Sequence, residues 1–195
     1  MFLPDKTIKK LCLGENPLIS PFCEEFLQSA SYDVHLAPGG KVINGEWNEE
    51  VFGPKVINLR KNRPEYKEIE WESFILYPGN SVIGSTVEKV CIPRNIRSSV
   101  EGKSSIGRMF ITAHFCAGYI DPGFEGNVVL EIHNASKVAY ILYTGMPIAQ
   151  LAFATLDEEC ERSYGECGNH YQGQSGTVES KWDYEKNDTE SRHII

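Results

Sequence analysis

The feature of this sequence that most restricts its fold is a series of short apolar runs in strand period, separated by turn residues. Tyr32, Val34 and Leu36 alternate with polar residues before a Pro-Gly-Gly turn. Similar runs follow at 74–77, 81–87, 128–133, 139–143 and 148–156. The chain of 195 residues has 17 Gly and 10 Pro to form the turns between such strands. This pattern predicts a mainly β fold of the sandwich or barrel type.

Two short helices are expected before the first strand. Asp5 is suited to cap a helix over 6–13, and aromatic residues at helical spacing predict a second helix over 22–28. Further along, the runs at 74–77 and 81–87 flank a Pro-Gly-Asn turn and predict a β-hairpin.

The composition of the chain suggests one domain with a tail. Residues 1–178 are expected to form a single domain, because the apolar runs extend through this part of the chain. Residues 179–195 carry too few apolar side chains to form a core of their own. We therefore expect a polar C-terminal tail at 179–195 that is mobile or orders against a neighbour.

The charge balance argues against several classes of partner. The sequence has 19 Lys and Arg against 27 Asp and Glu, a formal charge of -8. Duplex nucleic acid needs a basic face, so it is not an expected partner. No apolar run approaches the roughly 20 residues that span a bilayer, and the N-terminus lacks the apolar core of a signal peptide. We expect a soluble cytoplasmic protein that binds neither membranes nor nucleic acids.

The cysteines and histidines show no metal-binding spacing. No two of the six cysteines form a CxxC pair, and neither HExxH nor the HxE…PCxxC pattern of zinc-dependent deaminases occurs. The expectation is six free thiols and no catalytic zinc.

The residues best suited to chemistry lie between 101 and 131. The segment GKSSIGR at 102–108 places two cations and two hydroxyls between glycines, a composition suited to phosphate groups. Taken by itself, a solvated turn with ordinary surface cations explains this segment more simply. Asp121 likewise belongs to an Asp-Pro-Gly turn and needs no functional explanation.

Glu131 is harder to explain as a surface residue, because it interrupts the apolar run VVLEI. A carboxylate inside an apolar strand is costly unless it is paired or used in chemistry. Period two also allows it to face solvent, opposite Leu130 and Ile132. The residues alone do not decide between a solvated side chain and a half-buried general acid or base.

Five segments in order resemble the dCTP deaminase branch of the dUTPase-like superfamily. They are GKSSIGR (102–108), HFCAGYIDPGFEG (114–126), VVLEIHN (128–134), GMPIAQLAF (145–153) and YQGQSG (171–176). The resemblance implies a homotrimer of distorted β-barrel subunits, related to a jelly roll, with active sites at the subunit interfaces. It implies an enzyme that hydrolyses dCTP to dUTP and ammonia without zinc.

The resemblance also implies roles for individual residues in this reaction. Glu131 would activate water for attack on C4 of cytosine, supported by Ser104 and Arg108. The implied nucleotide contacts come from Lys103, Ser104, Ser105, Arg108, Ala117, Asp121, Val129, Leu130, Glu131, Tyr164, His170, Tyr171 and Gln174.

Within that set, each part of the nucleotide would have its own partners. Lys103, Ser105 and Arg108 would bind the triphosphate, with Mg²⁺ held mainly by the phosphates. Asp121 would bind the deoxyribose 3'-hydroxyl, and backbone groups near Val129 and Leu130 would read the pyrimidine edge. A C-terminal segment with Tyr164, His170 and Gln174 would close over the nucleotide.

Other members of the superfamily define the alternatives. A plain dUTPase has an apolar residue at the position of Glu131 and a glycine-rich tail motif that this chain lacks. A bifunctional branch continues to dUMP and pyrophosphate, and Ala117-Gly118 resembles its pattern, where one monofunctional branch has Ala-His. A non-catalytic nucleotide-sensing regulator is a further alternative. The expected nucleotide partners are dCTP, dUTP and dTTP.

Three residues depart from the usual pattern of the family. Cys116 replaces a threonine, so a hydroxyl is exchanged for a weak thiol donor. His170 replaces a lysine and carries less positive charge at neutral pH. Lys103 replaces an arginine and lacks its bidentate fork.

Overall fold

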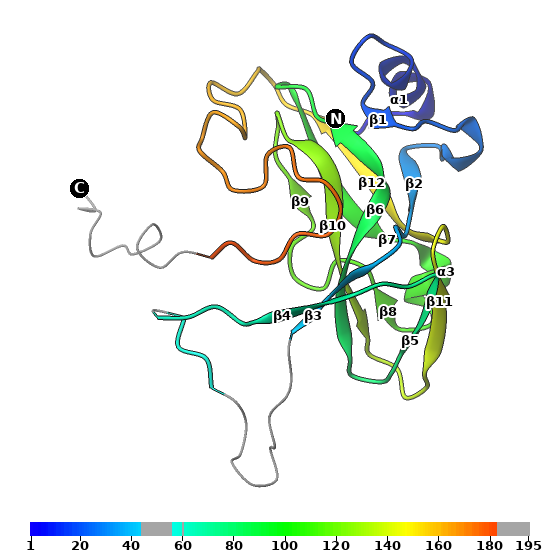
Figure 1. Cartoon of the computed structure of the whole chain (residues 1–195). Coiled ribbons are helices and arrows are strands. Elements are labelled where there is room, and N and C mark those ends of the chain that lie inside the picture. Colours follow the sequence, from blue (N-terminus) through cyan, green and yellow to red (C-terminus); the bar gives the residue numbers. More distant parts are fainter. Residues whose placement is uncertain (44–55, 60, 183–195) are drawn as a thin grey trace, which may run out of the picture.

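The computed structural model describes residues 1–43, 56–59 and 61–182. Three sheets form the body of the molecule (Figure 1). Its helical elements are α1 (Asp5–Cys12), η1 (Glu24–Phe26) and α3 (Ser104–Gly107). Its strands are β1 (Ile19–Ser20), β2 (Ser31–His35), β3 (Gly40–Ile43), β4 (Tyr66–Ile69), β5 (Ser73–Leu76), β6 (Ser81–Cys91), β7 (Ile96–Gly102), β8 (Ile111–Thr112), β9 (Tyr119–Ile120), β10 (Glu125–Asn134), β11 (Tyr140–Tyr143) and β12 (Pro147–Thr155). The prediction of a mainly β fold with short N-terminal helices is confirmed.

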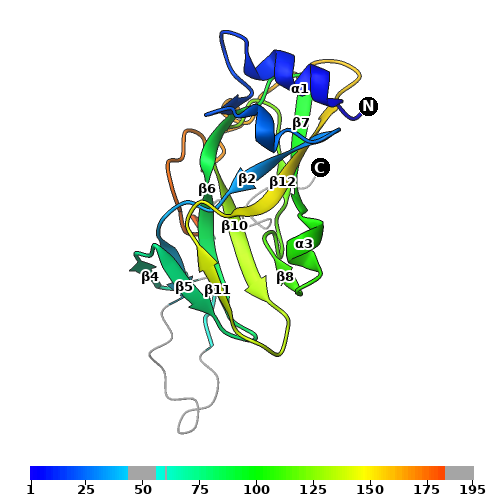
Figure 2. The same cartoon turned by 90° about the vertical axis from the view of Figure 1, so that its right-hand side faces the viewer.

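The strands pair antiparallel throughout the three sheets. The largest sheet has the order β4-β3-β6-β10-β8, with β1 paired to β6 outside this order. The second sheet has the order β2-β12-β7-β9, and β5 pairs with β11 in the third. Figures 1 and 2 show α1 at one end of the molecule and β4 and β5 at the other.

One cluster of buried apolar side chains joins the sheets. Leu130 and Ile132 of β10 are fully buried, as are Leu151 and Phe153 of β12. These positions alternate along each strand, as the period-two pattern of the sequence predicts. The opposite face of β10, which carries Glu131, is therefore turned away from the core.

Strand β2 departs from the expected alternation, because its polar side chains are buried too. Asp33 forms an ion pair with Lys103, and His35 Nδ1 lies 2.6 Å from Glu88 Oε1. The exposed fractions of Asp33, His35 and Glu88 are 5%, 7% and 4%. Such burial is tolerated because each of these three side chains is paired through at least one of its polar atoms.

The N-terminal helices are only partly as predicted. Helix α1 exists and buries Ile8 and Cys12, but Asp5 is its first residue and not its cap. Asp5 Oδ1 instead accepts a hydrogen bond from the N–H of Lys6 at 2.7 Å. The helix expected over 22–28 is wrong, since only the 3-10 turn Glu24–Phe26 forms there. The aromatic spacing has another cause: Phe22 and Phe26 both pack against the ring of Tyr32.

The predicted hairpin is also wrong, although its turn forms. Gly79 has φ of 75°, and the N–H of Asn80 donates to Tyr77 O at 3.1 Å. Beyond the turn, β5 pairs with β11 and β6 pairs with β10. Asn134, at the end of β10, bonds to both Gly79 and Asn80 and sends its side-chain amide to Leu76 O. The end of β10 thus bonds to the turn and to the end of β5. The two strands of the predicted hairpin, β5 and β6, belong to different sheets.

Three further expectations concern the cysteines, membrane spans and the C-terminal tail. All six cysteines are free thiols. In the described part of the chain, no helix is long and apolar enough to cross a membrane. The predicted tail at 179–195 lies outside the described residues except for 179–182, which contact the body of the protein.

Candidate active site

A cavity of about 380 Å³ brings together seven of the residues predicted for the site. Its size is within the range of small-molecule sites. The predicted residues that line it are Ala117, Asp121, Val129, Glu131, Tyr164, Tyr171 and Gln174. The lining residues not predicted from the sequence are Tyr66, Ile83, Val100, Tyr119, Ile120, Phe124, Val128, Val178, Glu179 and Ser180.

Glu131 projects from β10 into this cavity and is half-buried. Its Oε2 accepts hydrogen bonds from the backbone N–H groups of Cys116 and Ala117, at 2.6 and 3.0 Å. No described residue bonds to Oε1, which leaves that oxygen available to a water or ligand in the cavity. The Glu131 carboxylate therefore faces the cavity and not the core.

The loop that holds Glu131, residues 113–118, keeps its position through close packing at Gly118. The backbone of this loop bonds to β10, where the N–H of Phe115 donates to Glu131 O at 3.2 Å. A Cβ atom on Gly118 would lie 2.9 Å from the His114 ring and 3.0 Å from Val100 O. Such distances are too short without a shift of the loop, so the glycine keeps the two N–H groups in place beneath the carboxylate.

Asp121 and Tyr164 lie on another part of the lining. Asp121 is exposed and begins a turn that the N–H of Phe124 closes at 3.2 Å. The ring of Tyr164 meets that of Phe124 edge to face, with centroids 5.4 Å apart. Burial raises the pKa of Tyr164, and the charge of Asp121 adds to the rise. Tyr164 is therefore a neutral phenol at physiological pH and can donate a hydrogen bond.

The C-terminal segment, which we define as residues 171–182, forms a wall of the cavity. Gln174 accepts a backbone hydrogen bond from Asn127 of β10 at 3.1 Å, and its side chain donates to Asn127 O at 2.8 Å. Further along, Glu179 forms an ion pair with Lys41 of β3 at 2.5 Å. The segment is thus bound to two strands of the largest sheet.

The ion pair at Glu179 persists across neutral pH. Lys41 lowers the pKa of Glu179, and Glu179 raises the pKa of Lys41. Because the pKa of Glu179 is lowered, the stabilisation of the fold by this ion pair is fully present above the ordinary carboxyl pKa and is lost as the pH falls through the lowered value. Because the pKa of Lys41 is raised, the same stabilisation is fully present below the ordinary lysine pKa and is lost as the pH rises through the raised value.

Replacing Glu179 by Gln is expected to loosen the C-terminal segment modestly. Because the Glu179 side chain is 42% exposed, the pair is partly screened, and we expect the KM for a substrate bound in this cavity to rise about two- to fivefold with kcat nearly unchanged. Glu68→Gln is the matched control, since Glu68 also contacts Lys41, at 3.0 Å, but lies outside the segment. An equal rise in KM in both variants would show that Glu179 does not act by holding the C-terminal segment in place.

The predicted phosphate-binding residues Lys103, Ser105 and Arg108 do not line this cavity, and neither does Ser104, which was predicted to support the water. Lys103 pairs with the buried Asp33, and the exposed Ser104 and Ser105 belong to α3, a short helix where the sequence suggested a turn. The exposed Arg108 follows α3 as its C-cap. The predicted residues on α3 and at its two ends therefore form a second group, separate from the cavity of the same chain.

Two other predicted residues also lie away from the cavity lining. The side chain of Leu130 is fully buried in the core, so only its backbone could serve a ligand. His170 is exposed, with its ring 6.4 Å from that of Tyr171.

Comparison with known proteins identifies the family. The dCTP deaminase-like family model matches residues 2–156. The "dCTP deaminase, dUMP-forming" of Thermobifida fusca is 38% identical over 93% of this chain and 92% of its own length. The protein of the same name from Coprothermobacter proteolyticus is 40% identical over 90% of this chain and 93% of its own length. The chain belongs to the dCTP deaminase-like family.

A solved structure supports the same fold. The 2'-deoxycytidine 5'-triphosphate deaminase from Agrobacterium tumefaciens superposes with a TM-score of 0.60 at 22% identity. The match covers 79% of this chain and 48% of that one, so this chain spans about half the length of that protein.

Proposed function

We propose that this protein hydrolyses dCTP to dUMP, ammonia and pyrophosphate. The observation that carries the proposal is the carboxylate of Glu131, held by two backbone N–H groups and facing a cavity. The main interpretation of the sequence was an enzyme that stops at dUTP. The names of the relatives favour a dUMP-forming enzyme instead. Ala117-Gly118 agrees with the dUMP-forming pattern.

In the first step, Glu131 takes a proton from a water that attacks C4 of cytosine. The same carboxyl group delivers this proton to N3, then takes the proton of the new C4 hydroxyl and passes it to the leaving amino group, so that ammonia departs and a uracil ring remains. The N–H groups of Cys116 and Ala117 orient the carboxylate through Oε2, and Oε1 faces the water. A positioned general base of this kind contributes about 10²- to 10⁴-fold to the rate.

Asp121 and Tyr164 bind the sugar side of the nucleotide. Asp121 accepts a hydrogen bond from the 3'-hydroxyl, and backbone groups near Val129 and Leu130 bind the pyrimidine edge. In the second step, a water attacks the α-phosphorus, the bond to the bridging oxygen breaks, and pyrophosphate leaves. The overall reaction consumes two water molecules for each dCTP.

A second copy of the chain completes the site. Ser104 and Ser105 of α3 and Arg108 at its C-terminal end are exposed and absent from the lining of their own cavity. Close to them in the sequence Phe110 is 68% exposed, and Phe115, in the loop that holds Glu131, is 58% exposed. Exposed aromatic side chains next to both groups are typical of a contact surface. We assign a homotrimer in which α3 of one subunit supplies phosphate-binding residues to the cavity of the next.

Magnesium enters this scheme with the nucleotide. The described residues contain no group of three or more His, Cys, Asp or Glu side chains that could hold an ion by themselves. A hard cation that prefers oxygen ligands is then held mainly by the triphosphate. Mg²⁺ would neutralise phosphate charge there, while Lys103 and Arg108 would bind the phosphate oxygens. The free thiols agree with a reducing cytoplasmic location.

The shared site is tested by complementation between two inactive variants. Co-expression of Glu131→Gln and Arg108→Ala chains should restore activity to about one quarter of wild type, because one site in four then combines both intact residues. Each variant alone is the control. A mixed preparation as inactive as its components would contradict a site built from two subunits.

The activity itself is tested by incubating the protein with dCTP and Mg²⁺ and measuring ammonia. Release of ammonia is expected, with no release from dUTP. A plain dUTPase or a nucleotide-sensing regulator would release none from dCTP, and that result would overturn the proposal.

A further inference from the structure

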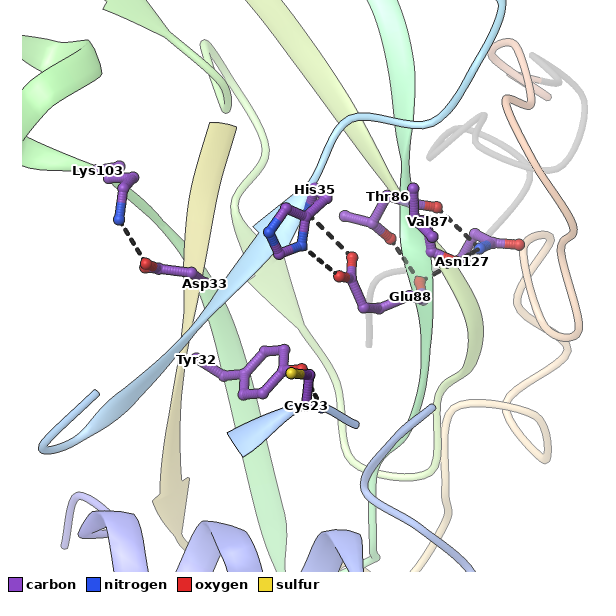
Figure 3. A network of polar contacts seen from close by, with 9 residues as sticks. All are labelled: Cys23, Tyr32, Asp33, His35, Thr86, Val87, Glu88, Lys103 and Asn127. Atoms are coloured by element: carbon purple, nitrogen blue, oxygen red, sulfur yellow. Dashed lines mark hydrogen bonds and ion pairs between the residues drawn. The ribbon is translucent and has the colours of Figure 1, made fainter. Parts of the chain in front are cut away.

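The buried polar network around Asn127 links the core of the protein to the C-terminal segment. Figure 3 shows His35, Glu88, Thr86 and Asn127 joined by hydrogen bonds. None of these four side chains takes part in the chemistry proposed above. Their burial is nevertheless extensive, with Asn127 only 7% exposed and Thr86 1% exposed. A polar network of this kind specifies a geometry when its members are satisfied.

The network begins at an irregularity between β6 and β10. Asn127 pairs with Lys89, whereas Val129 pairs with Ser85, so that three residues of β6 face one residue of β10. The carbonyl groups in this bulge have no regular partner on β10. The side-chain amide of Asn127 fills the gap, with Nδ2 at 2.9, 3.4 and 3.2 Å from the carbonyl oxygens of Thr86, Val87 and Glu88.

The bulge is fixed from its other side as well. The N–H of His35 donates to Glu88 Oε2 at 3.0 Å, and His35 Nδ1 lies 2.6 Å from Glu88 Oε1. Thr86 Oγ1 donates to Glu88 O and accepts from the N–H of Val128, at 2.6 and 3.0 Å. Because these bonds fix the bulge, the carbonyl groups that accept from Asn127 Nδ2 hold its side chain in a single orientation.

That orientation presents the remaining groups of Asn127 to the C-terminal segment. Its Oδ1 accepts from the N–H of Gly176 at 3.0 Å, while its backbone exchanges two hydrogen bonds with Gln174. Gly126, the preceding residue, has φ of 142°, and a Cβ atom there would lie 2.6 Å from Gln174 O. The C-terminal segment thus docks against β10 where Gly126 has no side chain and where Asn127 can bond to the segment.

We propose that Asn127 is a positioning residue that docks the C-terminal segment against the cavity. It touches no reacting atom, and it acts through Gln174 and Gly176 on the wall formed by residues 171–182. Its consequence for catalysis rests on the proposed function, because that wall must belong to the nucleotide site.

Two substitutions at Asn127 test the proposal, each with a matched control. Asn127→Asp places a carboxylate against three carbonyl groups, and Asn127→Ala removes the side-chain bonds without adding charge. Asn134 provides the controls, Asn134→Asp and Asn134→Ala. It is a fully buried asparagine on the same strand, whose amide donates to Leu76 O and Val138 O and whose Oδ1 accepts from Ser136. Thermal melts show which variants fold.

Hydrogen exchange of residues 171–182, without nucleotide, is the direct measurement. Both Asn127 variants should raise the exchange rate there by about tenfold or more, while peptides of β12 keep wild-type rates. The Asn134 variants should not change exchange in 171–182. Unchanged exchange in both Asn127 variants, or an equal rise in the Asn134 variants, would overturn the proposal.

The kinetic measurement separates this inference from the proposed function. With dCTP and Mg²⁺, the Asn127 variants should raise KM about tenfold with a smaller loss of kcat. Raised exchange in a protein that has no activity on dCTP would support the docking role and contradict the proposed reaction. Ammonia release from dCTP with normal exchange in the Asn127 variants would support the proposed reaction and contradict the docking role of Asn127.

Discussion

Replacing Glu131 by Gln is expected to lower kcat for ammonia release from dCTP by about 10²- to 10⁴-fold, with little change in Kd for the nucleotide. The Gln side chain keeps an oxygen for the N–H groups of Cys116 and Ala117, so the loop should stay in place. It has no group that can take a proton from water, and the loss should therefore fall on the chemical step. Single-turnover kinetics and nucleotide binding measure the two effects separately.

A carboxylate on the same strand serves as the control for this variant. Glu125 is exposed and does not line the cavity. Glu125→Gln removes the same charge from β10 and should keep wild-type kcat. Deamination by Glu131→Gln at the wild-type rate would show that another group is the general base.

Replacing Gly118 by Ala should cost nearly as much, although Gly118 carries no functional group. The added Cβ would lie 2.9 Å from the ring of His114 and 3.0 Å from Val100 O, so the loop must move. Because the neighbouring Cys116 and Ala117 hold Glu131, a shift of about 1 Å should reduce kcat about 10²-fold. Strain of this kind should also lower stability by about 1–3 kcal/mol. Steady-state kinetics and thermal unfolding measure both.

A glycine with room for a side chain gives the control. A Cβ on Gly14 would lie 3.6 Å from Leu11 O, an ordinary contact far from the cavity. Gly14→Ala should keep wild-type kcat. If Gly118→Ala were fully active, the packing of His114 against Gly118 would not be what positions the carboxylate.

The sequence predicted the strands better than their pairing. Alternation of apolar residues locates β10 and β12, because one face of each strand is buried in the core. Pairing depends on contacts far apart in the chain, and so the run at 74–77 was assigned to a hairpin with 81–87. In the structure β5 pairs instead with β11, more than 60 residues later. No local signal encodes that choice.

The candidate site was predictable where residues lie in a recognisable motif and not elsewhere. Glu131, Asp121 and Tyr164 belong to or follow such segments, and all three line the cavity. Tyr66 and Ile83 line it as well, but they arrive through the order of strands in the largest sheet. Asn127 could be seen only once the bulge between β6 and β10 was known.

The proposed reaction is the conversion of dCTP all the way to dUMP at one site. It is tested most directly by incubating the wild-type protein with dCTP and Mg²⁺ and quantifying ammonia, dUMP, pyrophosphate and dUTP in the same samples over time. Ammonia, dUMP and pyrophosphate should appear in equal amounts from the earliest time point, without accumulation of dUTP. Accumulation of dUTP in step with ammonia, with no pyrophosphate, would contradict it.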